Sequence, residues 1–362
     1  MSLTGRPPSP LRGFGATGLR AFALLALVLV PALAGLRASP FPAAQAAACE
    51  FDNVERIVAV GDVHGAYDRL LEILRAAAVI DARNRWIGGR MHLVQTGDVL
   101  DRGPASRQAL EFLRRLGRDA ERQGGRVHAL IGNHEVMRLI GDFRYVVPGE
   151  YAAFVNSDSE ATRRALVERY PAEQRARLQA ETPLGMIEMI RAFGLNQDLG
   201  KYLRTLDTVV RINGIVFLHG GISPSVAPMT CAEINDAVRR ELGPDFEKTR
   251  ANPSESLAAR VDGPLWYRGL ANESDGFAPE VKKILAAQHA RAIVVGHSAE
   301  PGLIRNRFDR TVFVIDTGMQ PAYLPNGRAS ALEIRGNVFT AVYKDSRQVI
   351  AGGDGGLSGA VR

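Results

Sequence analysis

Residues 56–65 read RIVAVGDVHG, an apolar run that ends in glycine, aspartate and histidine. The run has the length of a buried strand, and the residues after it are typical of a turn. The same arrangement recurs in residues 91–103, MHLVQTGDVLDRG, and in residues 127–135, VHALIGNHE. Two amphipathic segments, 67–78 and 106–123, separate the three runs and follow helical spacing. This βαβαβ order predicts an α/β fold with a parallel sheet and helices on its faces.

The pattern changes after this first part of the chain. Residues 136–207 are rich in Arg, Glu and Ala, follow helical spacing and lack strong strand patterns, so we expect a helical insertion over one end of the sheet. Short apolar runs then predict six more strands, at residues 209–212, 215–218, 292–295, 311–315, 331–334 and 338–343. The pair Asn213-Gly214 between the first two is a hairpin signal.

The amino terminus has the pattern of an export signal. Residues 1–34 combine a basic, acid-free start with the apolar run 21–30 and small residues at a cleavage spacing. The uncharged stretch 21–36 is shorter than a typical membrane span of roughly 20 residues. We therefore expect a signal peptide at 1–34, a bacterial periplasmic location and no stable membrane insertion after processing. An uncleaved anchor or a lipoprotein is the alternative.

The signal peptide is expected to precede one folded domain. Residues 35–50 are rich in Ala and Pro and are interpreted as a linker, residues 51–350 as the domain, and the Gly-rich residues 351–362 as a flexible tail. The chain has two cysteines, Cys49 and Cys231. They can pair in an oxidising compartment, although the sequence does not reveal whether their geometry allows it.

The overall charge gives little support for a nucleic-acid partner. The chain carries a formal net charge of +6, and Arg6, Arg12 and Arg20 contribute to it from the predicted signal peptide. A domain that binds nucleic acid usually shows a stronger and more clustered basic excess. We therefore expect no nucleic acid among the partners.

Polar side chains follow five of the predicted strands directly. The side chains that this pattern brings to one edge are Asp62, His64, Asp98, Asn133, His219 and His297. Ligands bind in the crevice beyond the carboxyl ends of strands in α/β folds. Carboxylate, amide and imidazole groups suit divalent ions such as Mn, Fe or Zn. The set predicts two divalent ions, and Asp98 is the natural bridge between them because a carboxylate has two oxygens.

Three further residues beside these loops carry the chemistry of proton and phosphate transfer. His134 adjoins Asn133, so it lies near the metals without having to bind them, and its imidazole is suited to general-acid catalysis. Asp101 follows Asp98 by three residues and can orient that ring. Arg102 offers a planar fork for phosphate oxygens, although a surface arginine in a salt bridge is the alternative.

A single motif of this kind is weak evidence, since Asp and Gly are common turn residues. Histidines within apolar runs, such as His92 and His128, are more often structural, and we interpret His289 in the same way. Four of the seven histidines, however, lie directly after strands beside Gly, with Asp or Asn partners. This joint occurrence favours a functional site.

The order GDVHG, GDVLDRG, GNHE, HGG and GH, which extends from Val60 to Ser298, resembles the phosphoprotein phosphatase branch of the calcineurin-like metallophosphoesterases. The stretch GPLWYRG at residues 263–269 and the helical segment after GNHE are similar to the Shewanella-like protein phosphatases. The resemblance implies a β-sandwich of two mixed sheets flanked by helices.

The resemblance also implies a role for each site residue. One metal would be held by Asp62, His64 and Asp98, and the other by Asp98, Asn133, His219 and His297. His134 would be the general acid, oriented by Asp101, while Arg102 and Asn133 would bind the phosphate. Arg268 ends the stretch PLWYR and is either a second phosphate clamp or part of a structural loop.

These features predict a metal-dependent phosphomonoesterase. The leading hypothesis is a protein phosphatase that acts on phospho-Tyr, phospho-Ser/Thr or both, with a phosphoprotein or phosphopeptide as its partner. The first alternative is a hydrolase of dinucleoside polyphosphates or another small phosphoester, because such enzymes share the core motifs. The second is a non-catalytic exported module that uses its metals structurally.

Overall fold

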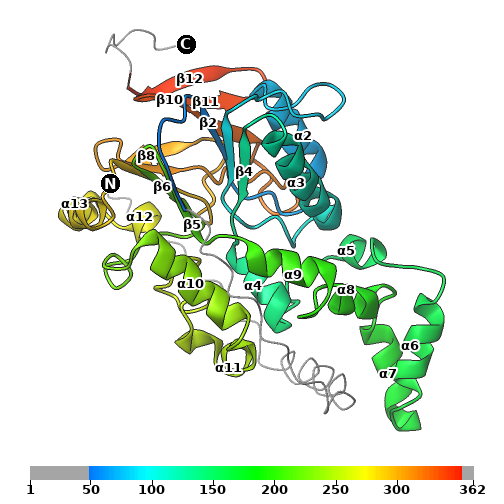
Figure 1. Cartoon of the computed structure of the whole chain (residues 1–362). Helices are drawn as coiled ribbons and strands as arrows, with labels where there is room; N and C mark the ends of the chain where they lie inside the picture. Colours follow the sequence, from blue (N-terminus) through cyan, green and yellow to red (C-terminus); the bar gives the residue numbers. More distant parts are fainter. Residues whose placement is uncertain (1–48, 353–362) are drawn as a thin grey trace, which may run out of the picture. The chain divides into compact units, whose positions relative to one another are not determined.

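The computed structural model of the protein describes residues 49–352 (Figure 1). The predicted signal peptide, the linker up to residue 48 and the tail from residue 353 lie outside the described residues. Within residues 49–352, no helix combines the length and the apolar character needed to cross a membrane.

The described residues form two mixed sheets of six strands each. In spatial order the first sheet contains β1 (Glu50–Phe51), β5 (Val209–Ile212), β6 (Ile215–Leu218), β7 (Ala292–Val295), β9 (Val312–Val314) and β8 (Arg305–Arg307). Strands β5 and β6 form the hairpin predicted at Asn213-Gly214, whereas β6, β7 and β9 run parallel. Parallel strands deliver their carboxyl ends to one edge of the sheet.

The second sheet contains β12 (Arg347–Ala351), β11 (Val338–Tyr343), β10 (Ser330–Arg335), β2 (Ile57–Val60), β3 (His92–Gln95) and β4 (Arg126–Ala129). Strands β2, β3 and β4 are parallel, as the βαβαβ pattern predicts, and the other pairs are antiparallel. Helices α2 (Tyr67–Ala76) and α3 (Ser106–Glu121) pack beside this sheet (Figure 1). They are the crossovers that parallel neighbours require.

The core lies between the two sheets. Residues from both inner faces, such as Ile57, Val94 and Phe217, are fully buried there. Across the interface the rings of Phe313 and Phe339 stack with their centroids 4.3 Å apart. The apolar runs thus bury one face of each sheet against the other, which confirms the predicted β-sandwich.

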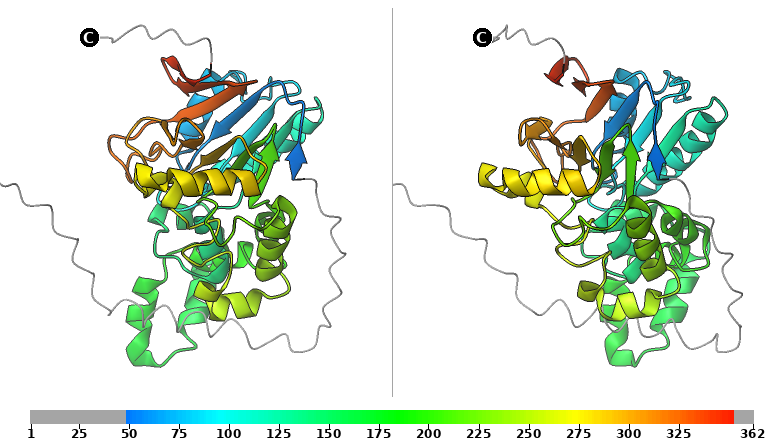
Figure 2. Two further views of the ribbon diagram at one scale, coloured as in Figure 1. Left: turned by 90° about the vertical axis from the view of Figure 1, so that its left-hand side faces the viewer. Right: turned by 60° about the vertical axis from the view of Figure 1, so that its left-hand side comes forward.

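Helices gather at the carboxyl ends of the parallel strands (Figures 1 and 2). Within the predicted insertion they are α4 (Asn133–Ile140), α5 (Pro148–Ala152), α6 (Ser159–Val167), α7 (Ala172–Glu181), α8 (Met186–Ala192) and α9 (Asp198–Thr205). Helices α6 and α7 extend farthest from the sheets (Figure 1). The segment after β6 adds α10 (Cys231–Leu242), α11 (Phe246–Ala251), α12 (Gly269–Asn272) and α13 (Ala278–Ala287), with 3₁₀ turns at Pro253–Glu255 and Asp275–Phe277.

The boundaries of the domain differ slightly from the sequence-based interpretation. Strand β1 begins at Glu50, inside the expected linker, because Glu50 and Phe51 pair with β5. A disulfide joins Cys49 to Cys231, whose Cα atoms lie 6.2 Å apart. Strand β12 ends at Ala351, the first residue of the expected tail. The folded domain therefore includes Cys49, Glu50 and Ala351.

Candidate metal centre

The candidate site lies where the loops after β2, β3, β4, β6 and β7 meet. Each loop contributes at least one of the six predicted ligands, and every one of them is at most 5% exposed: Asp62, His64, Asp98, Asn133, His219 and His297. Buried charged and polar groups need partners of their own. The structure therefore brings the whole predicted ligand set together in one buried place.

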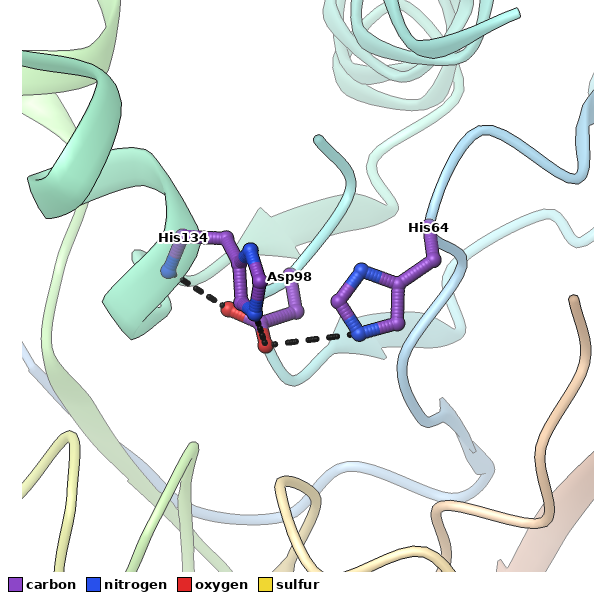
Figure 3. Close-up of side chains that lie close together, drawn as sticks. All are labelled: His64, Asp98 and His134. Carbon is purple, nitrogen blue, oxygen red and sulfur yellow. Dashed lines mark hydrogen bonds and ion pairs between the residues drawn. The ribbon is translucent and has the colours of Figure 1, made fainter. Parts of the chain in front are cut away.

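Asp98 lies at the centre of this cluster (Figure 3). Its Oδ2 atom is 3.2 Å from Nε2 of His219, 3.6 Å from Nε2 of His64 and 3.7 Å from Nε2 of His134. His64 and His134 approach this carboxylate from two sides (Figure 3). Most of these separations exceed the usual hydrogen-bond distance and suit donor atoms that surround a common cation.

Two groups of potential ligands share Asp98. One comprises His64, Asp98 and His134, and the other Asp98, His219 and His297. Asp62 is placed less centrally than the sequence suggests, since its Oδ2 lies 3.9 Å from Nε2 of His64 while its Oδ1 accepts the backbone N–H of His297. The sharing of Asp98 between both groups fits a bridging carboxylate.

The three histidines predicted as ligands are each fixed by a backbone carbonyl. The ring nitrogens and their partners are His64 Nδ1 with Leu100 O at 2.9 Å, His219 Nδ1 with Thr96 O at 2.9 Å, and His297 Nε2 with Trp266 O at 3.2 Å. A carbonyl oxygen only accepts, so the bonded nitrogen carries the proton and the other keeps its lone pair. This arrangement is typical of metal-binding histidines.

Asn133 and His219 place two potential donor atoms close together. Asn133 Oδ1 lies 2.8 Å from Nε2 of His219, the nitrogen that retains its lone pair. An amide oxygen and an imidazole nitrogen this close together can coordinate one cation. The residues present therefore fit the divalent ions that the sequence predicts.

His134 belongs to a second network beside these ligands. Its Nδ1 lies 2.7 Å from Oδ2 of Asp101, and the other oxygen of Asp101 accepts from Arg138 at 2.5 Å. Arg138 also donates to Glu150 in α5 at 2.8 Å. Burial alone would lower the pKa of His134, but the carboxylates of Asp98 and Asp101 outweigh it and raise that pKa. The ring is therefore oriented and kept able to hold a proton.

Two arginines border the site. Arg102 places Nη2 3.3 Å from Nε2 of His134. Arg268 donates from Nη1 to the carbonyl of His297 at 2.6 Å and to Oγ of Ser298 at 3.3 Å. Both guanidinium groups thus lie beside the predicted ligands, and Arg268 is also hydrogen-bonded to the loop that carries His297.

The family model for calcineurin-like phosphoesterases matches residues 55–301, which include all six predicted ligands as well as Asp101, Arg102, His134 and Arg268. The chain belongs to the calcineurin-like phosphoesterase family. It is therefore a metal-dependent phosphoester hydrolase, and the two mixed sheets are the fold of that family.

Three known proteins are similar to this phosphoesterase over most of its length. An uncharacterized protein from Schizosaccharomyces pombe is 32% identical over 80% of this chain and 81% of its own length. Shewanella-like protein phosphatase 1 from Plasmodium berghei is 29% identical over 75% of this chain and 69% of its own. Among solved structures, a cold-active protein-tyrosine phosphatase from a psychrophilic Shewanella superposes with a TM-score of 0.66 at 27% identity, covering 84% of this chain and 82% of that one.

The backbone of the phosphoesterase site is unusually bent. His64, Asp98, Asp101, Arg102 and His297 all have positive φ, between 47° and 67°. Residues other than glycine rarely adopt this conformation, and it tends to occur where a site requires it. Next to Asp98, a Cβ atom on Gly132 would collide with the Asp98 carboxylate. These backbone conformations therefore allow the loops to direct the polar side chains of the site toward one another.

Glu135 is a site residue to which sequence reasoning assigned no role. It is fully buried, and its carboxylate accepts the backbone N–H groups of Asp98, Val99, Leu100 and Gly132 at 2.8–3.0 Å. It thereby holds the loop that carries Asp98 against the start of α4. An acidic residue at the third position of a helix is a recognised capping signal that could have identified it.

Asp316 is a second residue that the sequence analysis missed. It lies two residues after the end of β9 and is buried. Burial of Asp62 and the charge of Asp316 both raise the pKa of Asp62. Burial and nearby charges, including Asp98, raise the pKa of Asp316 itself to about 6. Its position directly after the predicted strand 311–315 could have identified Asp316, but no histidine accompanies it as in most of the other loops.

The electrostatics of the site favour bound cations. Burial lowers the pKa of His64 to about 3 and that of His297 well below its usual range, so both rings are neutral and able to ligate. Burial would raise the pKa of Asp98, but the imidazoles of His219 and His134 outweigh it and keep that pKa low. Neutral imidazoles around an ionised carboxylate form a typical site for divalent metal ions.

Proposed function

We propose that this phosphoesterase is a dinuclear-metal phosphomonoesterase that dephosphorylates proteins at phospho-Tyr, phospho-Ser/Thr or both. The main support is the convergence of three carbonyl-fixed histidines on the Asp98 region, with His134 held beside them by Asp101. This arrangement combines metal ligands and a proton donor within one buried site. The names of the protein phosphatases that resemble it support the substrate class.

In this proposal Asp62, His64 and Asp98 hold one divalent ion, and Asp98, Asn133, His219 and His297 hold the other. Mn, Fe and Zn all suit these ligands. Two such ions acidify a shared water and polarise the phosphoryl group when they are bound. The family uses divalent metals, and the assignment of each ligand to one ion is part of the proposal.

The chain's own residues would then bind phosphate and move the proton. Arg102 and Arg268 lie beside the proposed ligands and can bind phosphate oxygens, as can Asn133, which is itself a proposed ligand. His134 would donate its proton from Nε2 to the leaving oxygen, since Nδ1 is occupied by Asp101. Arg138 and Glu150 would keep Asp101 in place, so the helical segment contributes to the position of the acid.

The helical segment also supports a restricted substrate. The carbonyl oxygen of Tyr145, which lies between α4 and α5, accepts the backbone N–H of Arg102 at 2.9 Å. Parts of residues 136–207 therefore touch the proposed phosphate-binding residues directly. We infer that this segment limits which phosphoesters reach the ions.

A panel of phosphopeptides assayed against diadenosine tetraphosphate, with purified and metal-defined protein, tests the substrate class. We expect turnover of the phosphopeptides. Preferential turnover of diadenosine tetraphosphate would favour the small-phosphoester alternative. No turnover of any phosphoester with Mn, Fe or Zn would favour a non-catalytic module.

We also propose that the protein is exported to the bacterial periplasm after cleavage of residues 1–34 or 1–46. The Cys49–Cys231 disulfide supports an oxidising compartment, and it uses the thiol that a lipoprotein at Cys49 would need. Amino-terminal sequencing of the native protein should find Gly35 or Ala47 first. An intact Met1 on membrane-bound protein would instead identify an anchor.

A further inference from the structure

Two tyrosines pack against the guanidinium group of Arg102. The ring centroid of Tyr323 lies 3.8 Å from Cζ of Arg102, and that of Tyr145 lies 4.6 Å from it. Tyr145 comes from the segment between α4 and α5, and Tyr323 from the segment between β9 and β10. Two regions that are distant in the sequence thus each place an aromatic ring on one arginine.

The same two rings also contact the histidines of the site. The ring of Tyr145 lies 5.1 Å from that of His134, and the ring of Tyr323 lies 5.6 Å from that of His64. One tyrosine therefore lies on the side of the proposed proton donor and the other on the side of a proposed metal ligand. Together they border the proposed phosphate position on two sides.

The two tyrosines are much more exposed than the two histidines that they contact. His134 is 2% and His64 is 4% exposed, whereas Tyr145 and Tyr323 are 39% and 37% exposed. Aromatic side chains commonly line the places where ligands bind beside a few polar groups. We call Tyr145 and Tyr323 the aromatic collar.

We propose that the aromatic collar selects aryl phosphates and makes phosphotyrosine in a peptide the preferred substrate. The inference rests on the proposed protein phosphatase function and adds a substrate preference and two specificity-determining residues. The phenyl ring of the substrate would pack against Tyr145 and Tyr323 while its phosphate contacts Arg102.

The depth of the site supports this choice. The phosphate would reach the partly buried Arg102 and the buried His134, whereas the rings of Tyr145 and Tyr323 are more exposed. In phosphotyrosine a phenyl ring separates the phosphate from the backbone, whereas in phosphoserine a single methylene does. The longer side chain spans the collar, and its ring gains aromatic contacts that an alkyl group lacks.

The collar has two other possible roles, which the experiment must separate. The tyrosines can serve only to hold the Arg102 guanidinium by cation–π contact. Alternatively they can stack on the adenine of a dinucleoside polyphosphate, since every base has a π face. Each role predicts a different pattern in how much kcat/KM falls for each substrate when a tyrosine is replaced.

The test compares Tyr145→Ala and Tyr323→Ala with the parent on two peptides of identical sequence, one with phosphotyrosine and one with phosphoserine. Each alanine variant should lower kcat/KM for the phosphotyrosine peptide by about 5- to 10-fold, the size of one aromatic pair contact. The loss on the phosphoserine peptide should be about twofold or less, because its side chain gains little from the rings.

Matched variants make the result specific. Tyr145→Phe and Tyr323→Phe should retain the phosphotyrosine activity, since the rings and not the hydroxyl groups make the contact. Ile87→Ala alters another exposed apolar residue, which belongs to neither the collar nor the metal centre, and should leave both rates unchanged. Inhibition by inorganic phosphate should also be unchanged in the alanine variants, which shows that Arg102 still binds phosphate.

Three outcomes would overturn the inference. Equal losses on both peptides, with weaker phosphate inhibition, would assign the tyrosines to holding Arg102. Undiminished phosphotyrosine activity in both alanine variants would remove any role in selection. If the parent cleaves diadenosine tetraphosphate but neither peptide, the proposed protein phosphatase function itself fails, and the phosphotyrosine preference fails with it.

Discussion

Histidines occupy two contrasting regions of this β-sandwich. At the carboxyl ends of the strands, His64 and His219 point toward Asp98 from loops with bent backbone. Between the sheets, His92 and His128 lie within strands β3 and β4, with His128 Nε2 3.1 Å from His92 Nδ1. Both regions are largely buried, and both contain paired imidazoles. Burial and proximity of histidines are therefore not enough to make a metal centre.

The partners of the rings distinguish the two regions. Phe51 packs against His92 and His128 with centroid distances of 5.3 and 4.9 Å. Burial lowers the pKa of His128 to about 3 and that of His92 to about 4, and the nearby charge of Arg126 acts in the same direction. Around Asp98, by contrast, carboxylates and backbone carbonyls fix the rings. The predicted metal site thus has a carboxylate at its centre, and the structural pair of His92 and His128 has none.

Removal of that central carboxylate should have the largest effect. Asp98→Asn replaces the proposed bridge by a weaker ligand, so we expect clearly less metal per chain and a fall in kcat/KM of more than about 100-fold, above the 10–100-fold typical of an outer-shell partner. Elemental analysis and a phosphatase assay measure both. His92→Phe, in the other region, should retain the metal. An Asp98→Asn protein with two tightly bound ions would rule out the bridging role.

His134 tests whether a histidine can belong to the site without binding metal. His134→Asn should lower kcat/KM for a phosphoserine peptide by roughly 10²–10⁴-fold, because an alkoxide needs a general acid to leave. The loss on p-nitrophenyl phosphate should be much smaller, since its leaving group is far less basic. Asp101→Asn should show a milder form of the same difference.

The metal content of the His134→Asn protein decides between two roles. We expect it to equal that of the parent. Loss of metal would make His134 a ligand, consistent with its place in one of the ligand clusters. Equal losses on the two substrates would indicate an electrostatic role in place of proton donation.

Arg268 should give an intermediate effect. If it clamps phosphate, Arg268→Ala should raise KM for a phosphopeptide by about tenfold, the size of one charge-assisted hydrogen bond, and leave the metal content unchanged. Steady-state kinetics with metal analysis measure both. Unchanged kcat/KM would dismiss the clamp, and loss of metal would show that its contact with the His297 carbonyl is what matters.

A substitution in the structural pair of His92 and His128 should change the stability of the protein and not its activity. We expect this effect to be the smallest of those described. The pKa of His128 lies near 3 in the folded state and near 6.5 in the unfolded state, so the unfolded chain binds more protons below about pH 6.5. The free energy of unfolding should therefore fall as the pH drops from about 6.5 toward 4. In His128→Phe that decline should be shallower.

Urea unfolding of the metal-free protein at several pH values measures this decline. His289→Phe, which changes an exposed histidine, is the matched control and should follow the parent. A decline in His128→Phe as steep as that of the parent would place the responsible protons elsewhere.

The sequence predicted the parts of the fold that rest on local pattern. The apolar runs predict strands at 56–60, 91–96 and 127–131, and each bound lies within two residues of β2, β3 or β4. The crossover helices α2 and α3 agree equally well with the helical spacing over 67–78 and 106–123. Strand β1 was missed since it has only two residues and depends on pairing with β5. Strand β8 (RNR) has no apolar residue, and β12 (RQVIA) has only three after a charged and polar start, so neither shows a strand pattern of sufficient length.

The same distinction applies to the site. His64 and His219 could be predicted because each follows a strand beside glycine, and His92 was interpreted as structural because it lies within an apolar run. The function of Glu135 depends on where four backbone N–H groups meet, which is a tertiary property. The aromatic collar depends on contacts between segments far apart in the chain, so no local pattern could reveal it.

The disulfide between Cys49 and Cys231 turns half of the chain into a closed covalent ring. Five of the six proposed ligands lie inside that ring, and only His297 lies outside it. Helix α7 is also part of the ring, has no buried residues and carries Arg175 and Arg177. A single cut by trypsin in α7 would open the ring without separating the pieces, and they would part only after reduction and denaturation. The most accessible helix of the ring can thus be cleaved while Asp98 and His297 remain in one covalent molecule.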